Sequence, residues 1–147
     1  MKMLRILLLF TLLAVKYQCT AQTKAEYVIY GTYCGMCEHN CIHTYKIQND
    51  TLFVDSAASH KKDIEYRWKA LSTQQYLSAK KIIDSIPDIL YTSENRRVFG
   101  HPDAADQCGI LVQIKIGDTV KRFDIDTFMN AIPVELRHYA KMLMVRP

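Results

Sequence analysis

The most reactive side chains of this 147-residue chain are concentrated between Tyr33 and His43. Three cysteines (Cys34, Cys37 and Cys41) and two histidines lie within these eleven residues. Thiol and imidazole groups at such spacings are compatible with disulfide bonds, a metal site or a redox-active dithiol. The residues of the cluster leave these three alternatives open.

Disulfide bonding is the first alternative. Cys19 lies in a segment that we expect to be removed, so the mature chain keeps four cysteines. An even number of cysteines in an oxidising compartment favours two disulfides, with three connectivities that spacing does not distinguish. A bond from Cys108 to an earlier cysteine would close a loop of roughly 70 residues and contribute about 4 kcal/mol on the chain-entropy model. The disulfide candidates are Cys34, Cys37, Cys41 and Cys108.

A zinc site is the second alternative. Cys34 and Cys37 have the two-residue spacing that brings two thiolates to one zinc ion. A second close cysteine pair is missing from the chain, and exported thiols tend to oxidise before zinc binds them. His101, Asp103 and Asp106 are compatible with a divalent cation, and Asp106 with His101 is compatible with an acid–base pair, although aspartates also cap turns routinely. The complete set of candidate ligands is Cys34, Cys37, Cys41, His43, His101, Asp103, Asp106 and Cys108.

A redox-active dithiol is the third alternative, with Cys34 as the nucleophile and Cys37 as the resolving thiol. Residues 29–37, Ile-Tyr-Gly-Thr-Tyr-Cys-Gly-Met-Cys, resemble the strand and active-site turn of the thioredoxin family. Ile86-Pro87 is similar to that family's substrate-side proline. The resemblance implies that the dipole of a long helix activates the first cysteine. Residues 41–48 alternate as a strand instead, which places a strand where the family has that helix.

The first 21 residues are typical of an export signal. Lys2 and Arg5 precede an apolar run from Ile6 to Val15, and small residues allow cleavage after Ala21. The run of ten residues is half of the about 20 that span a bilayer, so we expect no membrane span after cleavage. In an alternative hypothesis the chain is a lipoprotein whose mature chain begins at lipidated Cys19. We therefore expect a periplasmic, outer-envelope-associated or secreted protein.

The charge balance argues against nucleic acid as a partner. The whole chain has 19 basic and 15 acidic residues, but three of the basic residues and none of the acidic ones lie in the export signal. The mature chain would keep 16 basic residues against 15 acidic ones. Nucleic-acid binding calls for a basic stripe rather than scattered charges.

Hydrophobic periodicity assigns residues 22–147 to a single α+β domain. Six segments show the alternation of strands: residues 26–32, 41–48, 51–54, 64–69, 110–116 and 119–125. Ser72 and Gln75 form a capping-box pattern before a helical face at residues 73–85, and Pro133 opens a last helix. We therefore predict an antiparallel sheet of about five to six strands with two main helices packed on one face.

Two tight turns and one ambiguous stretch complete this assignment. Asn49-Asp50 and Gly117-Asp118 are expected to close hairpins, because these residue types tolerate the left-handed backbone of a two-residue turn. Where periodicity is weak, we expect a short extended segment at residues 88–91 and a turn of helix at residues 93–99.

As a whole, the chain resembles small exported α+β domains of unknown function from Bacteroidota-type bacteria. The resemblance rests on the export signal, the Cys34–Cys41 cluster, the following strand with Tyr45, and the late hairpin and helix. It implies an envelope location and supplies no activity. The chain has no serine elbow, phosphate-binding glycine loop or paired-histidine zinc helix. We therefore favour a non-catalytic, disulfide-stabilised domain that binds an unknown envelope or extracellular partner, with the oxidoreductase and the zinc-binding module as alternatives.

Overall fold

The computed structural model describes residues 24–35, 42–56, 66–102, 104 and 108–147, and the expected export signal lies outside them. The strands are β1 (Tyr27–Cys34), β2 (His43–Gln48), β3 (Thr51–Asp55), β4 (Trp68–Ala70), β5 (Arg96–Phe99), β6 (Cys108–Ile116) and β7 (Thr119–Asp126). The helices are α2 (Thr73–Asp84), α3 (Asp88–Thr92), the short 3-10 helix η3 (Met129–Ala131) and α4 (Val134–Leu143).

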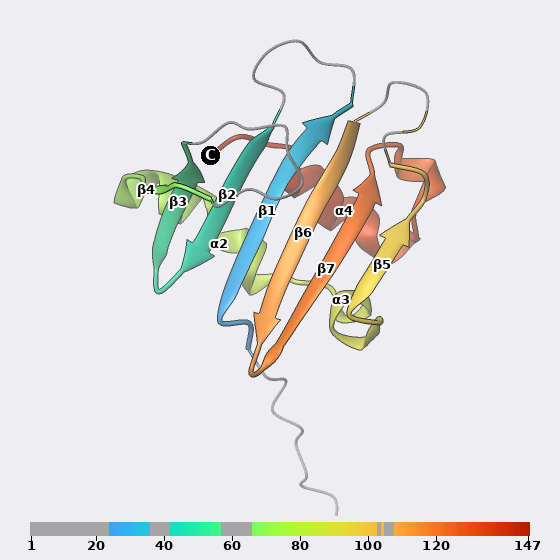
Figure 1. Cartoon of the computed structure of the whole chain (residues 1–147), viewed down its shortest axis with the longest axis horizontal. Coiled ribbons are helices and arrows are strands. Elements are labelled where there is room, and N and C mark those ends of the chain that lie inside the picture. The colour runs from blue at the N-terminus through green and yellow to red at the C-terminus, as the bar shows by residue number, and fades with distance from the viewer. Residues whose placement is uncertain (1–23, 36–41, 57–65, 103, 105–107) are drawn as a thin grey trace, which may run out of the picture.

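All the described strands belong to one mixed sheet with the order β4-β3-β2-β1-β6-β7-β5 (Figure 1). Neighbouring strands are antiparallel except β5, which runs parallel to β7. After β4 at one edge, the chain passes through α2 and α3 and re-enters the sheet as β5 at the opposite edge. The α+β class is confirmed.

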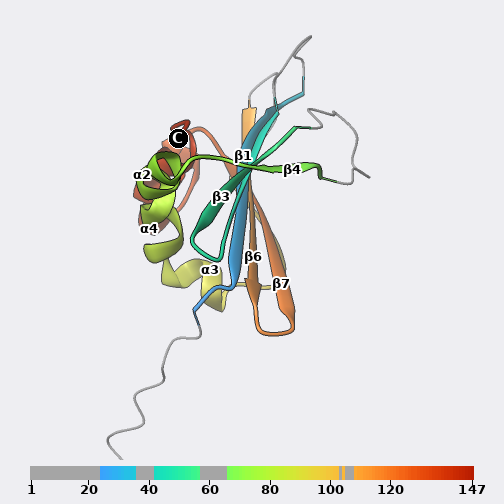
Figure 2. The same cartoon turned by 90° about the vertical axis from the view of Figure 1, so that its left-hand side faces the viewer.

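The sheet has one covered face and one open face. Figure 2 shows α2, α3 and α4 on the same side of the sheet. Alternate strand residues such as Val28, Tyr30 and Val112 pack with helix residues such as Leu136 and Tyr139 in one hydrophobic core. The residues between them in each strand belong to the other face, which none of the described helices covers and which we call the open face.

The two predicted hairpin turns and the two predicted main helices form where the sequence places them. Asn49 and Asp50 have positive φ values of 49° and 53°, and Gly117 has a φ of 53°. The Ser72 side chain accepts a hydrogen bond from the Gln75 backbone, and the Gln75 side chain accepts one from the Ser72 backbone. The predicted capping box therefore begins α2. The last helix, α4, buries one face with Leu136, Tyr139, Ala140 and Leu143.

The sheet differs from the prediction in size and in strand direction. The prediction of about five to six antiparallel strands is wrong, because seven strands form in the described residues and β5 is parallel. Residues 93–99, predicted as a turn of helix, contain β5. Three of the four β5 residues are exposed, so the alternation of a half-buried strand is missing from them.

The other local differences have similar causes. Residues 88–91, predicted as extended, lie in helix α3, which is too short to show a helical period. The Lys121 ammonium stabilises the end of α3 by donating to the carbonyls of Tyr91 and Ser93 at 2.6 Å each. Strand β4 begins at Trp68, later than the predicted strand at residues 64–69, of which residues 64 and 65 lie outside the described chain.

The buried carboxylate of Asp126 joins three segments near the end of β5. Its Oδ2 accepts a hydrogen bond from the His101 backbone at 2.9 Å, and its Oδ1 accepts one from the Phe128 backbone at 2.8 Å. Gly100 has a φ of 76°, and a Cβ there would lie 2.6 Å from the Asp126 Cβ. The close approach that Gly100 permits lets one side chain hold the segment after β5 and the segment after β7.

We expect Asp126→Ala to lower the free energy of unfolding by about 2 kcal/mol, because it leaves two partly buried N–H groups without their charged acceptor. Urea unfolding followed by circular dichroism measures this loss. Asp118→Ala, at an exposed turn, is the matched control and should change stability by less than about 0.5 kcal/mol. Equal effects of the two substitutions would contradict the structural role of Asp126.

Candidate functional site

A disulfide bond joins Cys34 to Cys108 at the same end of two neighbouring strands. The two cysteines are directly opposite each other in the β1–β6 pairing, with a Cα–Cα distance of 4.1 Å. Both side chains are partly exposed. The bond agrees with the prediction of a disulfide in this cluster and selects Cys34 as the partner of Cys108. Cys37 and Cys41 lie outside the described residues.

The environment of the disulfide includes His43 but no described metal site. His43 opposite Thr32 lies on the same face of the sheet as Cys34. Its Nε2 is 2.7 Å from a guanidinium nitrogen of Arg146. Because a guanidinium can only donate, Nε2 accepts, which places the proton of a neutral ring on Nδ1. The acceptor nitrogen of His43, Nε2, therefore points at the Arg146 guanidinium and is not available to bind a metal ion.

The proposed ligand set is not assembled in the part of the chain that the structure describes. Among those residues, no group of three or more His, Cys, Asp or Glu side chains could hold a metal ion. The sulfurs of Cys34 and Cys108 are bonded to each other, and the His101 backbone is bound to Asp126. Asp103 and Asp106 lie outside the described residues.

The geometry around Cys34 also differs from the pattern of the thioredoxin family. Cys34 is bonded to Cys108 rather than to Cys37. Strand β2 begins at His43, nine residues after Cys34, where the family would have its long activating helix. Pro87, compared above with the substrate-side proline of the family, precedes helix α3 instead of a strand.

A connected group of aromatic, amide and cationic side chains covers the open face. We call it the open-face cluster, and its members are Tyr27, Lys46, Tyr66, Trp68, Gln113 and Arg122. The rings of Tyr66 and Trp68 stack with centroids 4.7 Å apart. The Lys46 ammonium lies 4.8 Å from the centre of the Tyr27 ring and 5.9 Å from that of Trp68. These contacts connect strands from one edge of the sheet to its middle.

The cluster continues toward the other edge. The Gln113 amide donates a hydrogen bond of 3.3 Å to the Tyr27 hydroxyl. Burial raises the pKa of Tyr66, and the nearby Arg122 guanidinium opposes this increase. Tyr66 therefore stays neutral at physiological pH, and its hydroxyl remains available as a hydrogen-bond donor.

Cross-strand register places three of the open-face cations on one line. Lys46 is opposite Ile29, Ile29 is opposite Gln113, and Gln113 is opposite Arg122. Arg96 of β5 is paired with Arg122, so two exposed arginines are neighbours at the end of this line. Like charges directly opposite each other in a sheet are destabilising.

Sequence reasoning missed the open-face cluster. The signal was present, because large aromatic residues and lysine occupy the strand positions that alternate with the core positions, such as Tyr27, Lys46 and Trp68. Alternation identifies two faces but does not say which one the helices leave open. The line of cations also depends on the position of β5, which the sequence did not predict.

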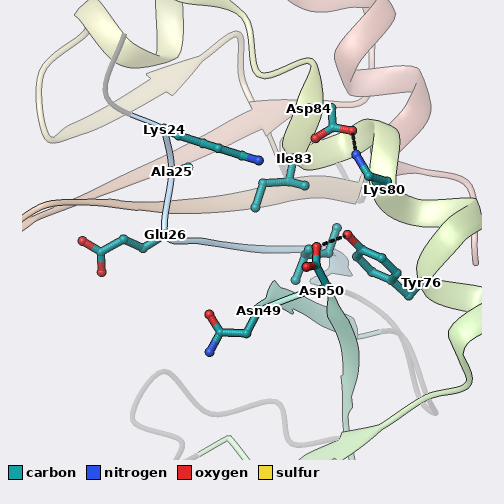
Figure 3. A pocket seen from close by; sticks show the side chains of 10 residues that line it. Lys24, Ala25, Glu26, Asn49, Asp50, Tyr76, Lys80, Ile83 and Asp84 are labelled. Atoms are coloured by element: carbon teal, nitrogen blue, oxygen red, sulfur yellow. Dashed lines mark hydrogen bonds and ion pairs between the residues drawn. The ribbon is translucent and has the colours of Figure 1, made fainter. Parts of the chain in front are cut away.

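A small pocket lies at the opposite end of the sheet from the disulfide, between the β2–β3 turn and α2 (Figure 3). Its volume is about 260 Å³, and charged side chains form much of its lining, including an ion pair between Lys80 and Asp84. Ligand pockets are usually larger and more apolar. Within this pocket, the Tyr76 hydroxyl donates to Asp50 Oδ1 at 2.6 Å. This hydrogen bond fastens the hairpin turn to the helix, so we assign the pocket a structural role.

Comparison with known proteins identifies no relative from which a function could be inferred. No protein-family model matches the chain, and no curated protein is significantly similar to it. None of the helices in the described residues is long and apolar enough to cross a membrane.

The hydrogen bond to Asp50 raises the pKa of Tyr76 to about 12, with burial contributing in the same direction. An ordinary tyrosine has a pKa near 10, so the stabilisation is fully present below pH 10 and is lost as the pH rises toward 12. We expect Tyr76→Phe to cost about 1–2 kcal/mol at pH 8. Urea unfolding should show the difference between the two proteins disappearing near pH 12. A difference that is independent of pH would contradict this assignment.

We expect replacement of both Cys34 and Cys108 by alanine to lower the free energy of unfolding by about 4 kcal/mol, because the disulfide spans 74 residues of sequence. Urea unfolding of the oxidised proteins measures this loss. Proteolysis without reductant, followed by mass spectrometry, should yield one linked pair of peptides containing these two cysteines. As a control, reductant should destabilise the wild type more than the double variant. Equal urea midpoints for the two oxidised proteins would contradict the stabilising role of the bond.

Proposed function

We propose that this chain is an exported, disulfide-stabilised domain that binds a ligand on the open face of its sheet and performs no catalysis there. The observation that supports this most directly is the distribution of side chains over the two faces. Three helices cover one face (Figure 2), while the other presents the open-face cluster, in which Tyr66 stacks on Trp68 and Lys46 lies over two rings.

The composition of the open face suits recognition. Tyrosine and tryptophan provide large, rigid contact surfaces and polar tips, and both residue types are enriched in binding sites. Most exposed large apolar side chains, such as Leu77, Phe128 and Val145, belong to helices or loops rather than to the open face. A ligand of this face would therefore be recognised through aromatic rings, amide groups and charged groups more than through an exposed apolar patch.

The disulfide supports the rest of the proposal. Disulfides persist in oxidising compartments, which agrees with the export signal expected at residues 1–21. The bond fixes β1 against β6, and these two strands supply Tyr27 and Gln113 to the open-face cluster. A rigid surface loses less conformational entropy on binding than a mobile one.

The single tryptophan of the chain, Trp68, reports directly on this face. We expect at least one fraction of the bacterial envelope (polysaccharide, peptidoglycan or protein) to change the Trp68 emission of the oxidised mature chain. Lys46→Glu should reduce the response about tenfold or more, because it reverses a charge inside the cluster. Lys69→Glu, exposed on the opposite side of β4, should leave the response unchanged.

Two outcomes would argue against the proposal. One is the absence of any emission change with all three fractions while circular dichroism shows folded protein. The other is an equal response of the two charge-reversed variants, which would place the interaction away from the open face.

A further inference from the structure

We propose that the ligand of the open face is an acidic glycan: a chain of hydroxylated sugar rings that carries carboxylate groups. This inference rests on the proposed binding function and names its ligand class. It follows from the arrangement of cations, amides and rings on the open face.

Two neighbouring arginines place two positive charges side by side on the open face. Arg96 and Arg122 are exposed and directly paired between β5 and β7. Adjacent strands are about 4.8 Å apart, so the two side chains start close together, and like charges at opposed positions destabilise the free protein. Guanidinium groups bind carboxylates through paired hydrogen bonds, and a carboxylate between these arginines would turn repulsion into attraction.

Lys46 adds a third positive charge at a distance from the two arginines. It lies on the same cross-strand line as Arg122, three strands away, which is about 14 Å between the backbones. A ligand that neutralises both ends of this line must be longer than one sugar ring and must carry more than one negative charge. The line runs perpendicular to the strands, so an extended oligomer could lie across the sheet.

The groups between these cations suit a hydroxylated chain. Gln113 lies between Ile29 and Arg122 on the line, and its amide both donates and accepts hydrogen bonds. The Tyr27 hydroxyl is directly beside it, at 3.3 Å. Between the cations at its two ends, the line carries the buried side chain of Ile29 and the amide of Gln113, and this amide suits a hydroxyl group of a sugar ring.

The same features make single-stranded nucleic acid a poorer fit. Binding of successive bases requires aromatic rings that are free to stack on them. Here Tyr66 and Trp68 stack on each other, and Lys46 lies over the rings of Tyr27 and Trp68.

The test compares four probes at 50 mM and 300 mM salt: oligogalacturonate, neutral dextran, oligo(dT) and poly-glutamate. Trp68 emission and isothermal titration calorimetry measure binding to the oxidised mature chain. We expect oligogalacturonate to bind more tightly than the other three, with an affinity that falls at high salt. Arg122→Gln and Arg96→Gln should each weaken this binding about tenfold. Arg122→Lys should retain part of it.

Arg97→Gln is the matched control, because Arg97 is the neighbour of Arg96 in β5 and faces the other side of the sheet. It should bind oligogalacturonate as the wild type does. Tighter binding of dextran, oligo(dT) or poly-glutamate, or no effect of Arg122→Gln, would overturn the acidic-glycan inference. If none of the four probes binds but an envelope fraction still changes Trp68 emission, the glycan inference fails and the binding function stands. If neither probes nor fractions bind, both fail.

Discussion

The pairing of β1 with β6 joins the two halves of this protein. The strands β1 to β4 follow one another along the chain and along the sheet, whereas β6 and β7 come after the helices α2 and α3. Every residue of β1 has a partner in β6, from Tyr27 with Lys115 to Cys34 with Cys108. Such non-local pairing costs loop-closure entropy, and the disulfide at its end reduces that cost by limiting the unfolded chain. The core and the open face both depend on this register, because a slip of one residue would exchange them.

The sequence predicts the elements of this fold better than their assembly. Turn chemistry at Asn49-Asp50 and the capping box at Ser72 are local signals, and the structure confirms both. Strand β5 and helix α3 are short, and their positions depend on contacts with β7 and Lys121, which are distant in sequence. A window of local sequence contains no information about such contacts. The predicted antiparallel sheet was wrong for this reason.

The candidate site was predicted in part. The cysteine cluster was expected to form two disulfides, and the structure contains one of them, Cys34–Cys108, while Cys37 and Cys41 lie outside the described residues. The choice of Cys108 as partner required the β1–β6 register, which spacing does not supply. Predicting the open-face cluster would have required the order and register of most of the sheet, because its members come from five strands or their flanking residues. Only the tertiary structure shows that Lys46 and Arg122 lie on one line.

The side chains that stabilise the fold and those that we propose bind a ligand lie on opposite faces of this sheet. The covered face holds the fully buried side chains that stabilise the fold, among them Tyr30 and Tyr139, whose pKa values burial raises well above the ordinary range. These hydroxyls therefore stay neutral, as a dry core requires. The open face keeps cations side by side, notably Arg96 and Arg122, although opposite charges there would stabilise the free protein better. A pairing that costs stability is understandable if its compensation comes from a bound anion, and this makes the open face, rather than the cysteine cluster, the place where binding should be sought.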